Sequence, residues 1–336
     1  MNTNSDFTAD DYPLKNIPDT PLWSENYAFA CHDAAQGIGM MVMLGRWWGD
    51  PTLWREVISV ALPGGRLLCI KNYGRAATEK IASASMFKVD VLRSQQSYRV
   101  SYDGPAWEQS RDDLIRFGFL ANSAKRCRID LVFDSDLPVW DMSGHGKSAS
   151  DIAGSLHIEQ VGSGNGFIEF GGERFDVKNA FMSRDHSRGV RILDKYKRHT
   201  WTQGYFDAED ITFNVYAMEV YGVEGLAMAS ASITQGKRRL PAAVKDIQLI
   251  NGHMDAWKPY QLTLSSELGD MPLKISKTVT SAPYSVLQLY DISHGRTLVA
   301  PAMGVYEEAV FWDWQGKPGV GWSERVFAPE KFPDPE

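Results

Sequence analysis

Hydrophobic and polar residues alternate with a period of two along most of the chain after residue 21. Residues 128–134 place Ile, Leu and Phe at every second position between Arg and Asp, and residues 260–265 alternate in the same way. Successive side chains of a β-strand point to opposite faces of its sheet. The period therefore predicts strands that are buried on one face.

Glycine-rich turns separate these strands and predict hairpins. The pair Gly171–Gly172 stands between residues 166–170 and 173–177, and Pro63–Gly65 divides residues 59–72 in the same way. Two strand-like segments around a short turn with glycine are typical of a β-hairpin. Many short strands at intervals of roughly 8–12 residues indicate an all-β sandwich or barrel.

Helical periodicity is scarce. Residues 112–119 and 76–84 are each expected to form one or two helical turns. Residues 162–166 read Gly-Ser-Gly-Asn-Gly, but they precede a strand pattern and not a helix. We therefore interpret them as a loop and not as a nucleotide-binding turn.

The length and the absence of a linker predict the domain organisation. A chain of 336 residues suits two domains of ~100–200 residues each. We expect a flexible N-terminal arm over residues 1–21, a β domain over 22–190 and a second β domain over 191–336. No Pro/Ser-rich segment marks the boundary, so the two domains are expected to pack tightly.

Composition and charge narrow the range of functions. The chain has 35 Lys and Arg against 42 Asp and Glu, a net charge of −7, which argues against nucleic-acid binding because phosphates need clustered positive charge. No apolar run reaches the ~18 residues of a spanning helix, and the first 21 residues lack the apolar core of a signal peptide. The three cysteines, at positions 31, 69 and 127, are too far apart in sequence to form a CxxC motif. We expect no membrane insertion, no disulfide and a cytoplasmic location.

Ionisable residues gather between positions 157 and 191. His157 and Glu159 are two residues apart on a predicted strand, so they should project from one face. Residues 182–191 then contain more ionisable groups than an ordinary turn needs. These are Arg184, Asp185, His186, Arg188 and Arg191.

The same region resembles the lipocalin-like family of carotenoid 1,2-hydratases (hydroxyneurosporene synthases) and AttH-like proteins. The hallmark of that family is a strand with His-x-Glu-Gln, a Gly-Gly hairpin and then Arg-Asp-His-Ser-Trp-Gly-x-Arg. Here the three parts read HIEQ, FGGERF and RDHSRGVR. Weaker similarity includes HDAAQGIGMMVMLGRW and LWREVISVALPGGRLL near the N-terminus and GVYEE near the C-terminus, so the resemblance covers about residues 23–308.

The resemblance implies two packed lipocalin-like (calycin-type) antiparallel β-barrel domains with a deep apolar pocket and no organic cofactor. It implies a lipophilic small-molecule substrate, such as a terpenoid, steroid or aromatic compound. The implied chemistry is that of a cofactor-independent lyase or hydratase, or of an isomerase or cyclase, acting in a β-barrel pocket. Arg188 stands where the family usually has Trp, and this change favours a more polar or anionic substrate.

Alkene hydration requires a proton donor, a cavity lining that stabilises the resulting carbocation, and a positioned water molecule. A buried Asp185 could stay protonated and act as the donor, while His186 or His157 holds the water or accepts its proton. Asp185 and His186 can face one pocket only if the chain bends there, and Ser187 and Gly189 would permit such a bend.

A second group of residues is expected to contact the substrate or to position the catalytic groups. At least one of His199 and Trp201 should line the same cavity as Asp185. The full set of expected binding residues is Arg184, Arg188, Arg191, Glu159, His199, Trp201, Tyr205 and Asp33.

Alternatives stay open at this point. The arginines and Asp185 could form a structural salt-bridge network that pins the crossover between the barrels. The protein could be a non-catalytic carrier of an apolar ligand, in which case the cavity should be uniformly apolar. No metal site is expected, because the histidines form no HxH or HExxH pattern. The sequence is compatible with a homo-oligomer.

Overall fold

The alternating segments form long antiparallel strands in the computed structural model, which describes residues 7–142, 155–192, 195–252, 255, 258–287, 291–297 and 302–328. Apart from 3₁₀ turns such as η1 (Thr8–Asp11) and η4 (Asp207–Glu209), the described helix is α1 (Arg111–Phe117). Among the described residues, no helix has both the length and the apolar character that crossing a membrane requires.

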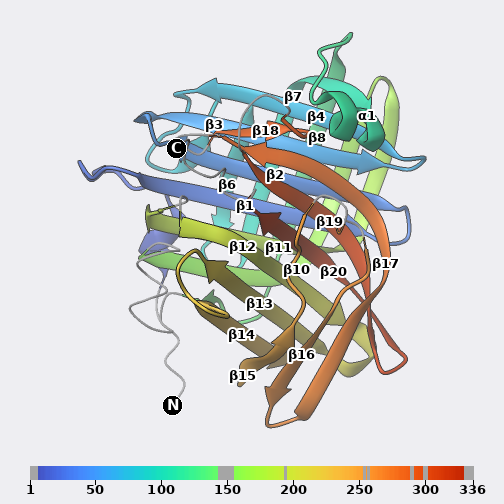
Figure 1. The fold of residues 1–336 in the computed structure, drawn as a ribbon. Coiled ribbons are helices and arrows are strands. Elements are labelled where there is room, and N and C mark those ends of the chain that lie inside the picture. Colours follow the sequence, from blue (N-terminus) through green and yellow to red (C-terminus); the bar gives the residue numbers. More distant parts are fainter. Residues whose placement is uncertain are drawn as a thin grey trace, which may run out of the picture.

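The first eleven strands form one sheet. They are β1 (Trp23–Asp33), β2 (Ile38–Trp47), β3 (Asp50–Leu62), β4 (Arg66–Gly74), β5 (Ile81–Ser83), β6 (Phe87–Arg93), β7 (Ser97–Ser110), β8 (Lys125–Asp134), β9 (Trp140–Asp141), β10 (Leu156–Phe170) and β11 (Glu173–Val190). Strands β4, β3, β2, β1, β11, β10, β8 and β7 are neighbours in this order, and β4 also pairs with β7. The sheet therefore closes into an antiparallel barrel, here named barrel A (Figure 1).

Nine further strands of the described part of the chain form a second sheet. They are β12 (Tyr196–Phe206), β13 (Ile211–Val220), β14 (Met228–Gln235), β15 (Arg238–Ile247), β16 (Gln261–Ser266), β17 (Gly269–Val286), β18 (Ile292–His294), β19 (Met303–Trp314) and β20 (Lys317–Phe327). The long strand β17 pairs with both β16 and β19, so this sheet also closes on itself and forms barrel B. The fold is thus all-β, with two lipocalin-like barrels packed together.

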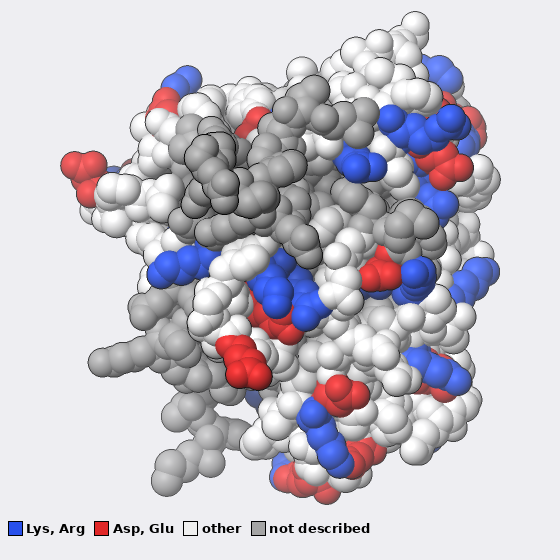
Figure 2. All heavy atoms as spheres, in the orientation of Figure 1, with Lys and Arg blue, Asp and Glu red and all other residues white. Residues whose placement is uncertain are grey.

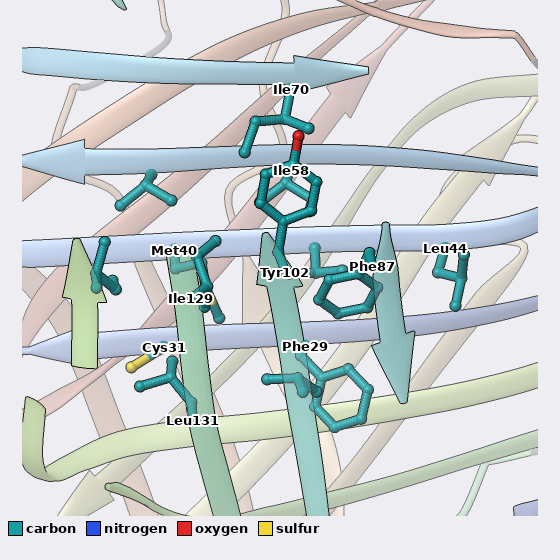
Figure 3. Close-up of a cluster of buried hydrophobic side chains, with 14 of the residues drawn as sticks. Phe29, Cys31, Met40, Leu44, Ile58, Ile70, Phe87, Tyr102, Ile129 and Leu131 are labelled. Carbon is teal, nitrogen blue, oxygen red and sulfur yellow. The ribbon is translucent and has the colours of Figure 1, made fainter. Parts of the chain in front are cut away.

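Each barrel has its own apolar core. Figure 3 shows Phe29 and Cys31 of β1 beside Met40 of β2 in the core of barrel A, and barrel B is filled around Phe213 and Trp312. The side chains at alternate positions of the same strands point outward and meet between the barrels. The period of two thus gives each of these strands one face toward a barrel core and one toward the partner barrel.

The contact between the barrels contains two apolar clusters. One includes Met41 and Phe181 of barrel A with Trp322 of barrel B. The other includes Val57 of barrel A with Val305 of barrel B. The space between these clusters is where the candidate site lies.

The hairpins expected around Gly171–Gly172 and Pro63–Gly65 are present as β10–β11 and β3–β4. The helix expected at 112–119 is α1, whereas no helix forms over 76–84, which leads into β5. The loop expected at 162–166 is also wrong, because these residues belong to β10.

Two glycines explain why residues 162–166 form a strand. Gly166 has φ +147° at a register shift of the β10–β11 pair, a conformation that suits glycine. A Cβ atom at Gly162 would lie 2.3 Å from the carbonyl oxygen of Asp134, so only glycine lets β8 approach this closely.

The N-terminal arm is anchored from residue 7 onward, in contrast to the flexible arm expected over 1–21. Asp11 is buried and accepts hydrogen bonds from the Tyr98 hydroxyl at 2.5 Å and from the Gln95 amide at 2.8 Å. The Leu14 amide donates to the buried Glu25 at 3.0 Å. Residues 1–6 lie outside the described part of the chain.

Charges are mixed over the surface. On the face shown in Figure 2, Lys and Arg side chains are interspersed with Asp and Glu side chains rather than gathered into one basic area. Pairs such as Arg99–Asp130 and Arg126–Asp103 occur on the surface of barrel A.

Candidate active site

A cavity lies between the two barrels, and its walls come from both. Together with the open solvent at its mouth, it contains about 860 Å³ of space free of protein atoms. The expectation of a pocket inside one barrel is therefore wrong, because the barrel interiors are filled by their own cores. The lining residues used below are Ala28, Met41, Met43, Arg55, His157, Asp185, Ser187, Arg191, His199, Trp201, Tyr216, Met303, Val305 and Glu324.

A buried histidine–carboxylate pair stands on the barrel A wall of the cavity. His157 of β10 contacts Asp185 of β11 through Nε2 and Oδ2, and the hydroxyl of Ser187 donates to Asp185 Oδ1 at 3.3 Å. Burial acts to raise the pKa of Asp185, but the charges of His157 and Arg191 outweigh it and lower that pKa. Asp185 is thus an ionised carboxylate, not the protonated acid expected from the sequence.

The neutral acid of this wall is Glu159. Its side chain is 1% exposed and lies 3.6 Å from Nε2 of His157. Burial, and then the negative charge of Asp185, raise the pKa of Glu159 well above its ordinary value. His157 and Glu159 project from one face of β10 as the period of two predicts.

A second histidine–carboxylate pair stands on the barrel B wall. His199 Nε2 of β12 lies 2.6 Å from Oε1 of Glu324 of β20. The ring of Tyr216 separates the two pairs, since it stacks on His199 at 5.2 Å and meets the edge of His157 at 6.0 Å. His199 and Trp201 both line the cavity with Asp185, as the sequence predicted for at least one of them.

The rest of the lining is mostly apolar. Met41 and Met43 of β2 and Met303 and Val305 of β19 all belong to this lining. Arg55 of β3 is a buried cation in the same lining. These residues and Glu324 could not be predicted as site residues from the sequence, because they come from strands remote in sequence and carry no motif of their own.

His186 does not belong to the cavity. Strand β11 pairs with β1 on one side and with β10 on the other without a bulge at residues 183–188, so the expected bend at Ser187 and Gly189 is absent. His186 therefore points into barrel A, where its ring stacks on Tyr27 at 3.8 Å. Burial lowers the pKa of His186 and favours the neutral ring.

Arg188 shares that inner face of β11. Its Nε donates to Glu25 at 2.7 Å, and its Nη1 to Asp10 of the N-terminal arm at 2.9 Å. Arg46 donates to the same Glu25 at 2.9 Å. Because these carboxylates neutralise Arg188 away from the cavity, its presence gives no reason to expect an anionic substrate.

Arg184 also points into barrel A. Its Nε donates to Gln160 at 3.0 Å, and its guanidinium lies 4.3 Å above the ring of Tyr98. The structure thus divides the ionisable segment of β11 between two faces. Asp185 and Ser187 face the cavity, whereas Arg184 and its alternate neighbours stabilise barrel A.

Three other expected binding residues lie outside the lining of the cavity, namely Glu159, Asp33 and Tyr205. Asp33 caps the turn after β1, where Oδ1 accepts from the amides of Ala35 at 3.1 Å and Gln36 at 3.0 Å. The hydroxyl of Tyr205 donates to Asp207 at 2.9 Å near the far end of β12.

One group of side chains has the composition of a metal site. Ligand atoms of His157, Glu159 and Asp185 all lie within 4.8 Å of one another. A histidine and two carboxylates suit a divalent cation such as Zn²⁺ or Mn²⁺. The contact between His157 and Asp185 and the raised pKa of Glu159 account for the same cluster without a metal.

Two antiparallel barrels with an amphiphilic cavity between them define a lipocalin-like fold. The chain belongs to the family described as domain of unknown function DUF7064, whose model matches residues 8–326. No curated protein matches the sequence.

Solved structures share the fold at low sequence identity. CghA is 11% identical with a TM-score of 0.60, over 93% of this chain and 90% of CghA. A putative AttH from Nitrosomonas europaea is 12% identical with a TM-score of 0.58, over 94% of this chain and 98% of that protein. Kievitone hydratase from Nectria haematococca is 12% identical with a TM-score of 0.53, over 90% and 88%. These similarities confirm the expected AttH-like and hydratase-like fold, and CghA is also known in a complex with Sch210972.

Proposed function

We propose that the protein is a cofactor-independent enzyme that hydrates, dehydrates, isomerises or cyclises a lipophilic small molecule in the cavity between the barrels. The observation that carries the proposal is the buried His157–Asp185 pair, which faces an otherwise largely apolar cavity. The names of its structural neighbours, a hydratase and a protein crystallised with a small molecule, support the same class of chemistry.

Physical roles follow from the geometry. The apolar lining holds the body of the substrate, and the His157–Asp185 pair moves a proton at its reacting end. Glu159 stands beside the pair as a neutral acid that can restore this proton. Arg191, whose charge lowers the pKa of Asp185, is the donor best placed to polarise a substrate oxygen.

A carrier is the second candidate, and the composition of the cavity argues against it. Burying ionisable side chains is energetically unfavourable, and the binding of an apolar ligand does not require them. Here His157, Asp185, His199 and Glu324 all converge on one cavity. Such convergence is typical of catalytic sites.

The test is a search for turnover. The protein is incubated in ¹⁸O-labelled water with a panel of lipophilic alkenes that includes kievitone, terpenoids and steroids, and the products are analysed by mass spectrometry. We expect a product that gains or loses the elements of water, or a cyclised isomer. Asp185→Asn should fold, melt near the wild type and lose about 10²–10⁴-fold in rate. Tight ligand binding without turnover would favour the carrier.

We further propose the cytoplasm as the location. Cys31, Cys69 and Cys127 are all free and buried. Burial raises the pKa of each thiol to about 12, so the thiols stay protonated and unreactive. Such thiols suit a reducing compartment.

A further inference from the structure

The second pair of the cavity is backed by another buried carboxyl group. Glu307 of β19 stands directly opposite Glu324 in the register of β19 and β20, and it is fully buried. Trp322 Nε1 donates a hydrogen bond to Glu307 Oε2 at 2.6 Å. Glu307 lies in the GVYEE segment, one of the stretches with weaker similarity to the hydratase family.

Two carboxyl groups placed opposite each other in a buried site do not both ionise. Burial, and then the charge of Glu324, raise the pKa of Glu307 well above its ordinary value. Burial acts in the same direction on Glu324, but the hydrogen bond and charge of His199 lower its pKa. At neutral pH Glu307 therefore holds a proton and Glu324 carries the charge.

The two walls of the cavity are built alike. On the barrel A wall, His157 contacts an ionised Asp185 with the neutral Glu159 beside it. On the barrel B wall, His199 contacts an ionised Glu324 with the neutral Glu307 behind it. Each wall thus holds a histidine, a carboxylate that lines the cavity and a stored proton.

Acid–base groups on both walls suit a reaction in which one proton is given and another is taken. In the addition of water to a double bond, a proton from one wall bonds to one carbon as the π bond breaks. The oxygen of water bonds to the other carbon and its proton passes to the opposite wall. The proton then returns through water, so both walls are restored. A pericyclic cyclisation needs no such transfer.

We propose that His199 and Glu324 are a second catalytic acid–base pair, that Glu307 is a positioning residue that stores their proton, and that the reaction gives one proton and takes another, the hydration or dehydration of an alkene being the case that we propose. The catalytic part of this inference rests on the proposed function, because it needs a substrate. The protonation of Glu307 can be measured without one.

The first experiment measures the proton directly. The infrared band of neutral carboxylic acids is recorded at neutral pH for the wild type, Glu307→Gln and Glu159→Gln. We expect each substitution to remove part of this band. Glu219→Gln is the matched control, since Glu219 is a carboxylate of barrel B whose pKa is lowered by Arg198 and Lys197 despite its partial burial. A band unchanged in Glu307→Gln would overturn the proton store.

The second experiment measures catalysis with the substrate that the panel identifies. Glu324→Gln should lose about 10²–10⁴-fold in kcat while it binds substrate normally. Glu307→Gln still accepts the Trp322 hydrogen bond, so it should fold and keep much of its rate, but its pH–rate profile should shift. Full activity of Glu324→Gln beside an inactive Asp185→Asn would overturn the second pair.

The outcomes separate the two proposals. If the wild type turns over no compound, the proposed function fails, and with it the catalytic role of Glu324. An infrared band that Glu307→Gln removes would then mark a buried proton that serves structure alone. If the wild type only cyclises its substrate without exchange of water, the enzyme class stands and the hydration inference is overturned.

Discussion

Asp185 and His186 are adjacent in sequence, but their side chains lie on opposite faces of β11 and belong to two separate networks. Asp185 contacts His157 at the cavity between the barrels. His186 lies inside barrel A, where its Nε2 is 3.2 Å from Glu25. Substitutions at these two positions should therefore have different effects, one on chemistry and one on stability.

His186→Phe keeps the stacked ring but removes the hydrogen bond to Glu25. We expect the free energy of unfolding to fall by about 1–3 kcal/mol, because Glu25 loses a buried partner. The rate per folded molecule should stay close to that of the wild type. Urea denaturation together with a rate assay checks both parts, and a loss of rate without a loss of stability would place His186 in the chemistry.

The Glu25 network predicts how stability depends on pH. Burial alone would raise the pKa of Glu25, but His186, Arg188 and Arg46 lower it from 4.5 to about 2. A lowered carboxyl pKa adds stability that is present above the unfolded value and is lost as the pH falls through the folded value. We expect a loss on the order of 3 kcal/mol between about pH 4.5 and pH 2.

The control for this prediction is Glu25→Gln. The variant leaves two arginines with a neutral partner, so it should be less stable at pH 7. It should also lose less stability than the wild type between pH 4.5 and pH 2. Parallel acid-unfolding curves for the two proteins would show that other carboxylates govern the acid transition.

Asp11 anchors the N-terminal arm to barrel A. Asp11→Ala removes the acceptor for Tyr98 and for the amide of Gln95. We expect a decrease of about 1–3 kcal/mol in the free energy of unfolding, since buried donors lose their partner. Limited proteolysis should cut the arm of the variant faster than that of the wild type. An arm that resists proteolysis equally in both proteins would contradict the anchoring role.

The cavity can be filled from barrel A. Ala28 lines it, so Ala28→Leu should occupy the space and weaken the binding of an apolar fluorescent probe by at least about tenfold, which corresponds to about 1.4 kcal/mol. Stability should change little, because the added methyl groups enter empty space. The matched control is Ala76→Leu at an exposed position, which should bind the probe as the wild type does. Equal binding by both variants would place the probe elsewhere.

The local parts of the fold could be predicted from the sequence, and the assembled site could not. Alternation and Gly-Gly turns are properties of neighbouring residues, so the β10–β11 hairpin and the shared face of His157 and Glu159 were predictable. The pairing of His199 with Glu324 spans 125 residues, and no local pattern encodes it. The bend expected after Asp185 fails because β11 has a paired strand on both sides, which keeps it extended.

The position of the cavity has a consequence for how the molecule is held together. Each wall belongs to a different barrel, so a bound small molecule contacts both and acts as a non-covalent bridge between them. Its binding free energy then adds to the cohesion of the two barrels, in proportion to the logarithm of ligand concentration over Kd. Occupancy of the cavity would thus appear as a greater resistance of the two barrels to separation.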